Sequence, residues 1–306
     1  MFISTFIGSL NLKRKTNFYI IITFVCLLNI NLNINETMSS ISHPRLLLLS
    51  NSTMAGTKYM EWVKNLINDF LSISKVRQIL FIPFAGVTIT WDKYSEMVQN
   101  ALPNIEIKSI HITANYIEAV NNAEAIMIGG GNTFHLLYKL YEYNLLDAIR
   151  NRVLGKNKIP YVGWSAGSNV AGPDIGTTND MPIIWPPSDK SLNLVPYNLN
   201  PHYNEWTPPN FKGETRIDRL NECVQVKQRP ILAYSEGVAI KVENGKHNLI
   251  APNLPDEFLL RQADDRKVKL WIFKDGKPEI VQLELDSEVS QKIDSLTKNV
   301  RIDVFN

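Results

Sequence analysis

Residues 159–171 read IPYVGWSAGSNVA, an apolar run followed by a cluster of small residues. The run from Ile159 to Trp164 has the continuous apolar character that is typical of a parallel strand buried on both faces. The small residues from Ala166 onward are predicted to begin a helix. Ser165 therefore lies at a predicted strand-to-helix turn, and such turns are typical of α/β folds.

Strand-like and helix-like segments alternate on both sides of this turn. The predicted strands cover residues 45–50, 78–86, 105–112, 123–132 and 159–165. The predicted helices cover residues 59–73, 93–102, 133–155 and 213–226, with a break expected near Asn144. This alternation predicts a mostly parallel sheet with helices on both faces, in which chemistry is expected at the carboxyl ends of the strands.

The later part of the chain is predicted to be more irregular. Residues 186–210 are rich in Pro and Asn and are expected to form loops. Residues 230–246 are expected to form two strands, the second ending in a hairpin turn at Asn244-Gly245. Residues 268–285 are expected to form a C-terminal hairpin, and the polar tail after it a loose helix.

Ser165 stands in the pattern Gly163-Trp164-Ser165-Ala166-Gly167, a G-x-S-x-G match. In a nucleophile elbow, small neighbours allow a strained turn to close, and the serine oxygen is exposed at the end of the sheet. The backbone N–H of Ala166 would then lie at a helix N-terminus, where it can stabilise an oxyanion. The alternative is a corner that needs small residues only for packing. The position between a predicted strand and a predicted helix favours a nucleophile.

A nucleophilic serine needs a base, which is often a histidine. His202 lies in the irregular segment downstream of Ser165, where active-site loops are common, and it is the favoured candidate. His111 lies near the end of a predicted strand and His135 in the first turn of a predicted helix, and a lone histidine is more often structural than catalytic. His247 lies beside a predicted hairpin turn and is expected to be solvated.

The base in turn needs a carboxylate that orients it. Asp180, in the stretch TTNDMP, follows Ser165 by fifteen residues. Glu236, in the stretch AYSEG, ends a predicted strand and could lie on the same rim as Ser165. The residue pattern alone does not choose between these two acids.

A glycine run, Gly129-Gly130-Gly131-Asn132, follows another predicted strand. It lacks the spacing of a P-loop and that of a dinucleotide-binding turn. The run is therefore interpreted as backbone that approaches a substrate closely, with Gly130, Gly131 and Asn132 as binding residues. No group of His and Cys residues has metal-ligand spacing, so no metal is expected.

Composition and charge are those of an ordinary globular protein. The 306 residues are 44% hydrophobic and 20% charged, and the net charge of +2 gives no indication of nucleic-acid binding. The two cysteines are Cys26 and Cys223, so residues 39–306 contain one thiol and no internal disulfide. This cysteine use favours a reducing, cytoplasmic compartment.

Residues 1–38 differ from the rest of the chain. A basic cluster, Lys13–Lys15, precedes an apolar run from Phe18 to Leu28 that is too short for a comfortable membrane span but suits the core of a signal peptide. Two interpretations stay open: a leader that would direct the protein to the secretory route, or a wrongly assigned start of a protein that begins at Met38. Residues 39–306 are expected to form a single catalytic domain.

A series of stretches in the body resembles, in order, the peptidase E family, which is family S51 of the serine peptidases. They read LLLLSNST, FIPFAGVTITWDKY, IGGGNTFHLL, YVGWSAGSNVAGP, TTNDMPI, LNLVPYNLNPHY and KGETRIDRL. The resemblance implies a three-layer α/β/α sandwich with a mostly parallel sheet, related to class I glutamine amidotransferase domains. It also implies hydrolysis of dipeptides that begin with aspartate, without a metal or an organic cofactor.

The resemblance also assigns roles to matching positions. It implies that Ser165 is the nucleophile, His202 the base and Asp180 the third member of the triad, with Glu236 as the rival for that third role. The stretch KGETRIDRL adds two candidate cations for the aspartate side chain of the substrate. Arg216 is favoured because its planar guanidinium can hold both carboxylate oxygens, and Lys212 is the second candidate. The alternative for both is a solvated helix face.

Two other functions stay open at this point. An α/β-hydrolase esterase also uses the order serine, acid, histidine, but Asp180 and His202 follow Ser165 by only 15 and 37 residues. That spacing leaves little room for the strands and helices that usually separate those members. A non-catalytic module that binds a small ligand at the glycine run would leave the serine, histidine and acid unexplained. The sequence predicts no oligomeric state.

Overall fold

A computed structural model describes residues 43–252 and 266–297. The described residues belong to one compact unit. Residues 1–38, for which a leader or a wrongly assigned start is predicted, lie outside the described part. Among the described residues, no helix is both long and apolar enough to cross a membrane.

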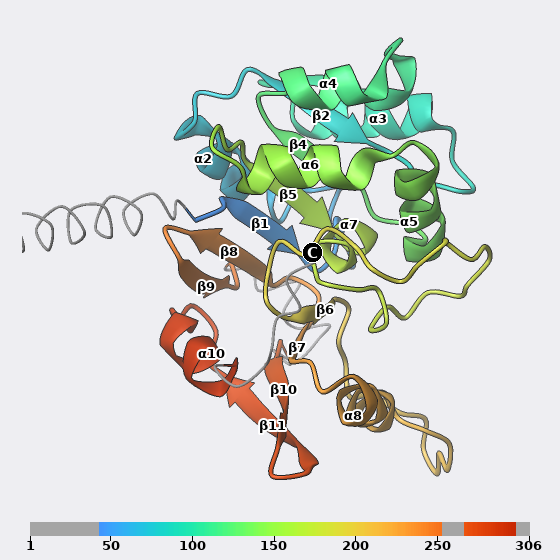
Figure 1. The fold of residues 1–306 in the computed structure, drawn as a ribbon, viewed down its shortest axis with the longest axis vertical. Coiled ribbons are helices and arrows are strands. Elements are labelled where there is room, and N and C mark those ends of the chain that lie inside the picture. The colour runs from blue at the N-terminus through green and yellow to red at the C-terminus, as the bar shows by residue number, and fades with distance from the viewer. Residues whose placement is uncertain (1–42, 253–265, 298–306) are drawn as a thin grey trace, which may run out of the picture. The chain divides into compact units, whose positions relative to one another are not determined.

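Seven strands form a mixed sheet in the order β3-β2-β4-β5-β1-β8-β9 (Figure 1). The first five strands in this order run parallel, β8 pairs antiparallel with β1, and β9 pairs antiparallel with β8 at the edge of the sheet. The strands are β1 (Leu46–Leu49), β2 (Gln78–Ile82), β3 (Glu106–Ser109), β4 (Ile126–Ile128), β5 (Tyr161–Trp164), β8 (Ala239–Glu243) and β9 (Lys246–Ile250). The carboxyl ends of the parallel strands therefore lie together at one end of the sheet.

Helices cover both faces of this sheet, as the alternation of segments predicts. One face carries α2 (Lys64–Ser72) and α3 (Trp91–Ala101). The other face carries α4 (Tyr116–Asn122), α5 (Thr133–Glu142), α6 (Leu145–Leu154) and α7 (Ala166–Asn169). The expected three-layer α/β/α arrangement with a mostly parallel sheet is confirmed.

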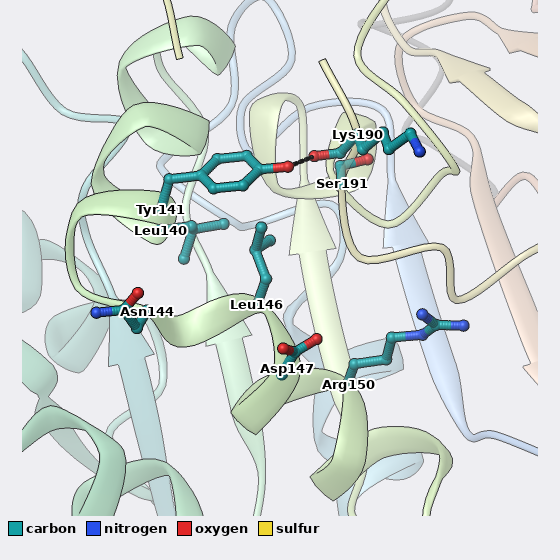
Figure 2. Close-up of a pocket in the computed structure, with 8 residues that line it drawn as sticks. All are labelled: Leu140, Tyr141, Asn144, Leu146, Asp147, Arg150, Lys190 and Ser191. Atoms are coloured by element: carbon teal, nitrogen blue, oxygen red, sulfur yellow. Dashed lines mark hydrogen bonds between the residues drawn. The ribbon is translucent and has the colours of Figure 1, made fainter. Parts of the chain in front are cut away.

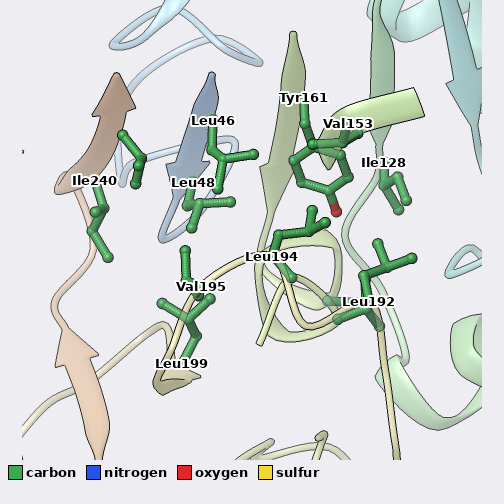
Figure 3. Close-up of a cluster of buried hydrophobic side chains, with 14 of the residues drawn as sticks. Leu46, Leu48, Ile128, Val153, Tyr161, Leu192, Leu194, Val195, Leu199 and Ile240 are labelled. Carbon is green, nitrogen blue, oxygen red and sulfur yellow. The ribbon is translucent and has the colours of Figure 1, made fainter. Parts of the chain in front are cut away.

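The two faces follow from the alternation of side chains along each strand. Leu46 and Leu48 of β1 belong to one buried cluster, and Leu47 and Leu49 belong to the other. Figure 3 shows part of the first cluster, where Leu46, Leu48 and Tyr161 lie near the chain segment of Leu192 and Leu194. Because both faces of β1 are covered, its continuous run of leucine is buried throughout, which is the pattern of a central parallel strand.

A second sheet has four strands in the order β11-β10-β7-β6. Its strands are β6 (Asn198–Asn200), β7 (Ile231–Tyr234), β10 (Val268–Lys274) and β11 (Lys277–Leu283). The strands β6 and β7 are parallel, whereas β10 pairs antiparallel with β7 and β11. The hairpin of β10 and β11 is the expected C-terminal hairpin. The strand β6 lies in the segment that was expected to be a loop.

One helix, α8 (Arg216–Lys227), lies beside the second sheet (Figure 1). Its Leu220 and Val224 belong to one buried cluster with Ile231 and Trp271 of that sheet. The opposite face of this sheet joins the larger core through side chains such as Leu232. The last described helix is α10 (Ser290–Thr297), within the tail that was expected to be a loose helix.

Some predicted elements have different bounds in the structure. The strand expected over 105–112 ends at Ser109, and Ile110–Ile112 form the short 3-10 helix η1. The helix expected over 59–73 begins at Lys64, after a series of turns. The break expected near Asn144 is present, because this residue adopts a left-handed φ of 55° between α5 and α6.

Candidate active site

Ser165 occupies a strained turn between β5 and α7. Its φ of 52° and ψ of −113° lie outside the regions that a residue with a side chain ordinarily adopts. The turn is held because the backbone N–H of Ser165 donates to the carbonyl of Leu49 at 3.1 Å. A Cβ on Gly167 would lie 2.1 Å from the carbonyl oxygen of Ile128, so this position of the G-x-S-x-G pattern has room only for glycine. The geometry is that of the predicted nucleophile elbow.

His202 and Glu236 extend from Ser165 as a chain of hydrogen bonds. The Nε2 atom of His202 lies 2.9 Å from Oγ of Ser165. The Nδ1 atom of the same imidazole lies 2.9 Å from Oε1 of Glu236. A carboxylate accepts but does not donate, so Nδ1 carries the proton toward Glu236 and Nε2 is free to accept from the serine hydroxyl.

The strand arrangement brings these three residues together. The parallel strands β6 and β7 place their carboxyl ends side by side, and His202 and Glu236 each follow one of these strands by two residues. The chain then enters β8, which pairs antiparallel with β1 so that Ala239 lies opposite Leu49. The start of β8 is therefore beside the carboxyl end of β1, the neighbour of β5, and this brings Glu236 to the same end of the sheet as Ser165.

Asp180, which was favoured over Glu236 as the partner of His202, lies elsewhere. Its carboxylate accepts hydrogen bonds from the backbone N–H of Thr133 at 2.7 Å and from the hydroxyl of Thr178 at 3.1 Å. The structure thus places the rival carboxylate on His202, and the expectation for Asp180 does not match the geometry. The physical reason is the parallel pairing of β6 and β7, which turns His202 toward Glu236.

The glycine run packs directly against the nucleophile. A Cβ on Gly130 would lie 2.9 Å from Cβ of Ser165. The carbonyl of Gly130 accepts a 2.9 Å hydrogen bond from the hydroxyl of Tyr94 on α3. Because a trans peptide directs its C=O and N–H to opposite sides, the N–H of Gly131 points away from Tyr94. Among the described residues, the amides of Gly130, Gly131 and Ala166 have no hydrogen-bond acceptor.

Tyr94 was not predicted to have a part in the site. Its spacing along α3 indicates only that it belongs to the apolar face of that helix. Burial raises the pKa of its phenol well above the usual range, so the hydroxyl stays protonated and can donate to Gly130. The sequence signal that could have indicated this role is its place in the family-like stretch FIPFAGVTITWDKY.

Asn132 was expected to bind substrate, but its side chain has partners within the protein. It caps α5 by accepting from the N–H of His135 at 3.0 Å, and it donates to the carbonyl of Met181 at 2.8 Å. Its amide group is thus committed to the loop structure, and any contact of this segment with substrate would come from the glycines.

Arg216 is the first residue of α8 and lies beside the loop after β6 that carries His202, which we refer to as the histidine loop. Its Nη1 donates to the backbone carbonyl of His202 at 2.8 Å. The side chain is partly buried, and burial lowers the pKa of the guanidinium from its very high ordinary value. No acidic side chain in the described part of the chain forms an ion pair with Arg216. Lys212 is exposed in the loop that precedes α8.

The three other histidines that were considered as the base have structural partners. His111 bonds to Ser109 at 2.6 Å and to Asp92 at 2.9 Å, and His135 donates through Nδ1 to the carbonyl of Phe84 at 2.6 Å. His247 was expected to be solvated, yet it is 9% exposed and lies 2.8 Å from the hydroxyl of Tyr197. The expectation is wrong because β9 packs His247 beneath α10 and its preceding turn, where its backbone N–H bonds to the Ser290 hydroxyl.

Two pockets lie away from Ser165. A pocket of about 350 Å³ between α5, α6 and the segment of Lys190 is lined by Tyr141, Asp147 and Arg150, among others (Figure 2). A second pocket of about 390 Å³ lies along residues 86–91 and His135. Neither pocket includes Ser165, His202 or Glu236. The candidate active site is therefore identified from its hydrogen-bonded side chains and not from the size of a cavity.

A partly exposed serine on a strand-to-helix turn, bonded to a histidine that a carboxylate holds, defines a serine hydrolase built on an α/β sheet. Among solved structures, the fold resembles that of a peptidase from an acI-B1 Actinobacterium, with a TM-score of 0.56 and 15% identity. That likeness covers 82% of this chain and 98% of the other, and at such low identity it concerns the fold alone.

Sequence comparison places the chain within one family. The model of peptidase family S51 matches residues 46–250. The chain is 48% identical to Peptidase E of Nostoc over 209 residues, which are 67% of this chain and 85% of that protein. It is 44% identical to Peptidase E of Haemophilus influenzae over 208 residues, which are 67% of this chain and 94% of that protein. The protein therefore belongs to peptidase family S51, a serine peptidase family, and the esterase and binding-module alternatives are set aside.

Proposed function

We propose that the protein is a dipeptidase that cleaves dipeptides with an N-terminal aspartate by serine-type nucleophilic catalysis. The observation that carries this proposal is the chain Ser165–His202–Glu236, with both hydrogen bonds at 2.9 Å. Membership of family S51 supports the reaction class, and relatives named Peptidase E support the substrate class.

In the proposed reaction, Oγ of Ser165 attacks the carbonyl carbon of the aspartyl residue. Nε2 of His202 takes the hydroxyl proton and then gives it to the leaving amine of the second residue. The acyl-enzyme is released when a water molecule attacks, with His202 as base again. Glu236 keeps the imidazole in the tautomer that can accept the proton and stabilises the imidazolium that forms.

The tetrahedral intermediate carries a negative oxygen that needs donors. The N–H of Ala166 lies at the start of α7, where helix amides have no internal partner. The N–H groups of Gly130 and Gly131 lie on the loop that packs against Ser165. We assign the oxyanion hole to Ala166 and this loop, because such fixed backbone donors act where charge develops.

The aspartate side chain of the substrate needs a cation in a partly desolvated site. Arg216 meets this need because it is bonded to the carbonyl of His202 and has no acidic partner in the described part of the chain. Its Nη1 serves the histidine loop, and the remaining guanidinium donors are available for a carboxylate. Lys212, which is exposed, is the weaker candidate.

The test compares substrates and one variant. The purified protein should release aspartate from Asp-Leu, with much slower cleavage of Asn-Leu and of a simple ester. Ser165→Ala should lose activity by about 10⁴-fold or more, because a triad member is removed while the fold is retained. Near-normal turnover by that variant would falsify the assignment of Ser165, and equal rates on Asp-Leu and Asn-Leu would contradict the substrate class.

The proposal includes no metal or organic cofactor, no nucleic-acid partner, and a cytoplasmic location. The near-neutral charge of the chain and its single thiol outside residues 1–38 support these choices. Cell fractionation with an antibody to the protein tests the location. Recovery of the active protein from the medium or from a secretory compartment would contradict it.

A further inference from the structure

Asp180 lies away from His202 and is bonded to the start of α5. Its Oδ2 accepts a 2.7 Å hydrogen bond from the N–H of Thr133, the first residue of that helix. The hydroxyl of Thr178 donates to the same oxygen at 3.1 Å. A carboxylate at this point satisfies a backbone donor that has no partner within the helix, and its charge suits the positive end of the helix dipole. Asp180 is therefore placed to hold α5.

The neighbouring residues form a second hydrogen bond in the same direction, with its donor again at the start of α5. The side-chain amide of Asn132 donates to the carbonyl of Met181 at 2.8 Å. These two hydrogen bonds join adjacent residues of one loop, Asp180 and Met181, to adjacent residues at the start of α5, Asn132 and Thr133. We refer to this pair of contacts as the clamp.

The clamp also reaches the nucleophile through buried side chains. The hydroxyls of Thr178 and Thr133 are 3.1 Å apart, and Nδ2 of Asn169 lies 3.3 Å from the hydroxyl of Thr133. Asn169 ends α7, and its backbone N–H donates to the carbonyl of Ser165 at 2.9 Å. Thr133 and Asn169 are 0% and 4% exposed. Displacement of Asp180 would thus alter the positions of both α5 and α7.

The clamp holds the chain directly after the glycine loop, residues 129–131. This loop packs against Ser165 at Gly130, and the N–H of Asn132 donates to the carbonyl of Ala85, in the loop after β2, at 2.9 Å. Oxyanion donors act only when they lie within a few tenths of an ångström of the required position. We propose that Asp180 is a positioning residue that, through Thr133, sets the glycine loop against Ser165 without contacting substrate. This inference rests on the proposed function.

Two substitutions at Asp180 separate this role from that of a charged partner of His202. Asp180→Asn keeps an oxygen that can accept from the N–H of Thr133, and should keep kcat on Asp-Leu within about tenfold of wild type. Asp180→Ala leaves that buried N–H without its acceptor and should lower kcat by about 10²-fold to 10³-fold, the effect typical of losing one oxyanion donor. The KM for Asp-Leu should change by less than about threefold in both variants, because ground-state binding is not altered.

The experiment measures kcat, KM and the pH dependence of kcat/KM for wild type and both variants, with thermal unfolding as a check on the fold. Asp147→Ala is the matched control, because Asp147 is likewise an acid near the N-terminus of a helix, in the first turn of α6, but lies in the pocket away from Ser165 (Figure 2). Its kcat should match wild type. The pH profiles of both Asp180 variants should keep the wild-type shape, because the Ser165–His202–Glu236 chain is intact.

Three results would overturn the inference: an Asn variant as damaged as the Ala variant, a pH profile that moves in both, or an Ala variant with wild-type kcat. If Asp180→Ala does not fold, Asp180→Asn and Thr178→Val decide the matter, the latter removing one bond to Asp180 and lowering kcat more than it changes KM. Failure of the proposed function would look different, because wild type would then not cleave Asp-Leu or Ser165→Ala would remain active.

Discussion

The imidazole of His202 and the carboxylate of Glu236 are joined at 2.9 Å although the residues are 34 positions apart. Each follows one of two parallel neighbours, β6 and β7, by two residues. A further bond, from the N–H of Tyr203 to the carbonyl of Tyr234 at 3.1 Å, continues the pairing past the end of β6. The orientation of the base is thus a product of strand register.

Replacement of Glu236 tests this relationship. Glu236→Gln should lower kcat on Asp-Leu by about 10²-fold to 10⁴-fold, because an amide that donates to Nδ1 favours the tautomer with its proton on Nε2. The measurement is steady-state kinetics of the folded variant, with Asp180→Asn as the matched loss of a carboxylate. A greater loss of kcat in Asp180→Asn than in Glu236→Gln, at equal stability, would return Asp180 to the triad.

Much of this arrangement could be predicted from local patterns. Four of the five parallel strands are short apolar runs, and β3 alternates polar and apolar residues along Glu106–Lys108. Ser165 directly follows one of the apolar runs, so the turn that holds it can be recognised in the sequence. The break between α5 and α6 is visible because Asn144 tolerates a left-handed backbone.

The choice of carboxylate could not be predicted, because it depends on pairing between distant segments. The strand β6 has three residues in a Pro-rich and Asn-rich stretch, and nothing in that stretch shows that it pairs with β7. The environment of His247 is a similar case. Its neighbours in sequence suggest a turn at the surface, but its burial comes from the segment around Ser290.

Replacement of Arg216 tests selectivity. Arg216→Met should lower kcat/KM for Asp-Leu by about 10²-fold or more, in line with the loss of a desolvated charge pair. The variant should gain relative to wild type on Asn-Leu, whose side chain needs no cation. Because Nη1 also holds the carbonyl of His202, a smaller loss of kcat should appear on every dipeptide.

Arg219→Met is the control for this experiment, since Arg219 lies on the same helix with its side chain 70% exposed. Its preference for Asp-Leu over Asn-Leu should equal that of wild type. If Arg216→Met keeps the wild-type preference for Asp-Leu over Asn-Leu, Arg216 supports the histidine loop and does not bind the aspartate side chain.

Replacement of Tyr94 tests the support of the glycine loop. Tyr94→Phe removes the hydroxyl that holds the carbonyl of Gly130, and kcat should fall by about tenfold, which corresponds to about 1.4 kcal/mol in the barrier. KM should stay near the wild-type value. Tyr141→Phe, which removes a comparable bond to the carbonyl of Lys190 in the distant pocket, should not change kcat (Figure 2). Equal kinetics for the two variants would show that Gly130 needs no support from Tyr94.

The pH dependence of stability should report the burial of His247. Burial lowers the pKa of this imidazole to about 4, and it outweighs the carboxylates of Asp294 and Glu288, which act to raise the pKa, while His43 acts to lower it further. The unfolded chain therefore binds a proton at higher pH than the folded chain does. The contribution to stability is complete above about pH 6.5 and is lost as the pH falls toward 4, by at most about 3 kcal/mol. Urea unfolding at pH 7, 5.5 and 4.5 measures this loss.

The variant His247→Gln isolates the effect of this one group, because many carboxylates also titrate below pH 5. Gln is neutral throughout and can still accept from the hydroxyl of Tyr197, which donates to Nδ1 of His247 in the neutral imidazole. The variant should be less stable than wild type at pH 7, because its side chain does not match the shape of the imidazole site. The difference should shrink as the pH falls from 6.5 to 4, since only wild type loses stability through His247. Parallel curves for the two proteins over this range would mean that His247 is protonated equally in the folded and unfolded chains, contrary to its burial beneath Ser290.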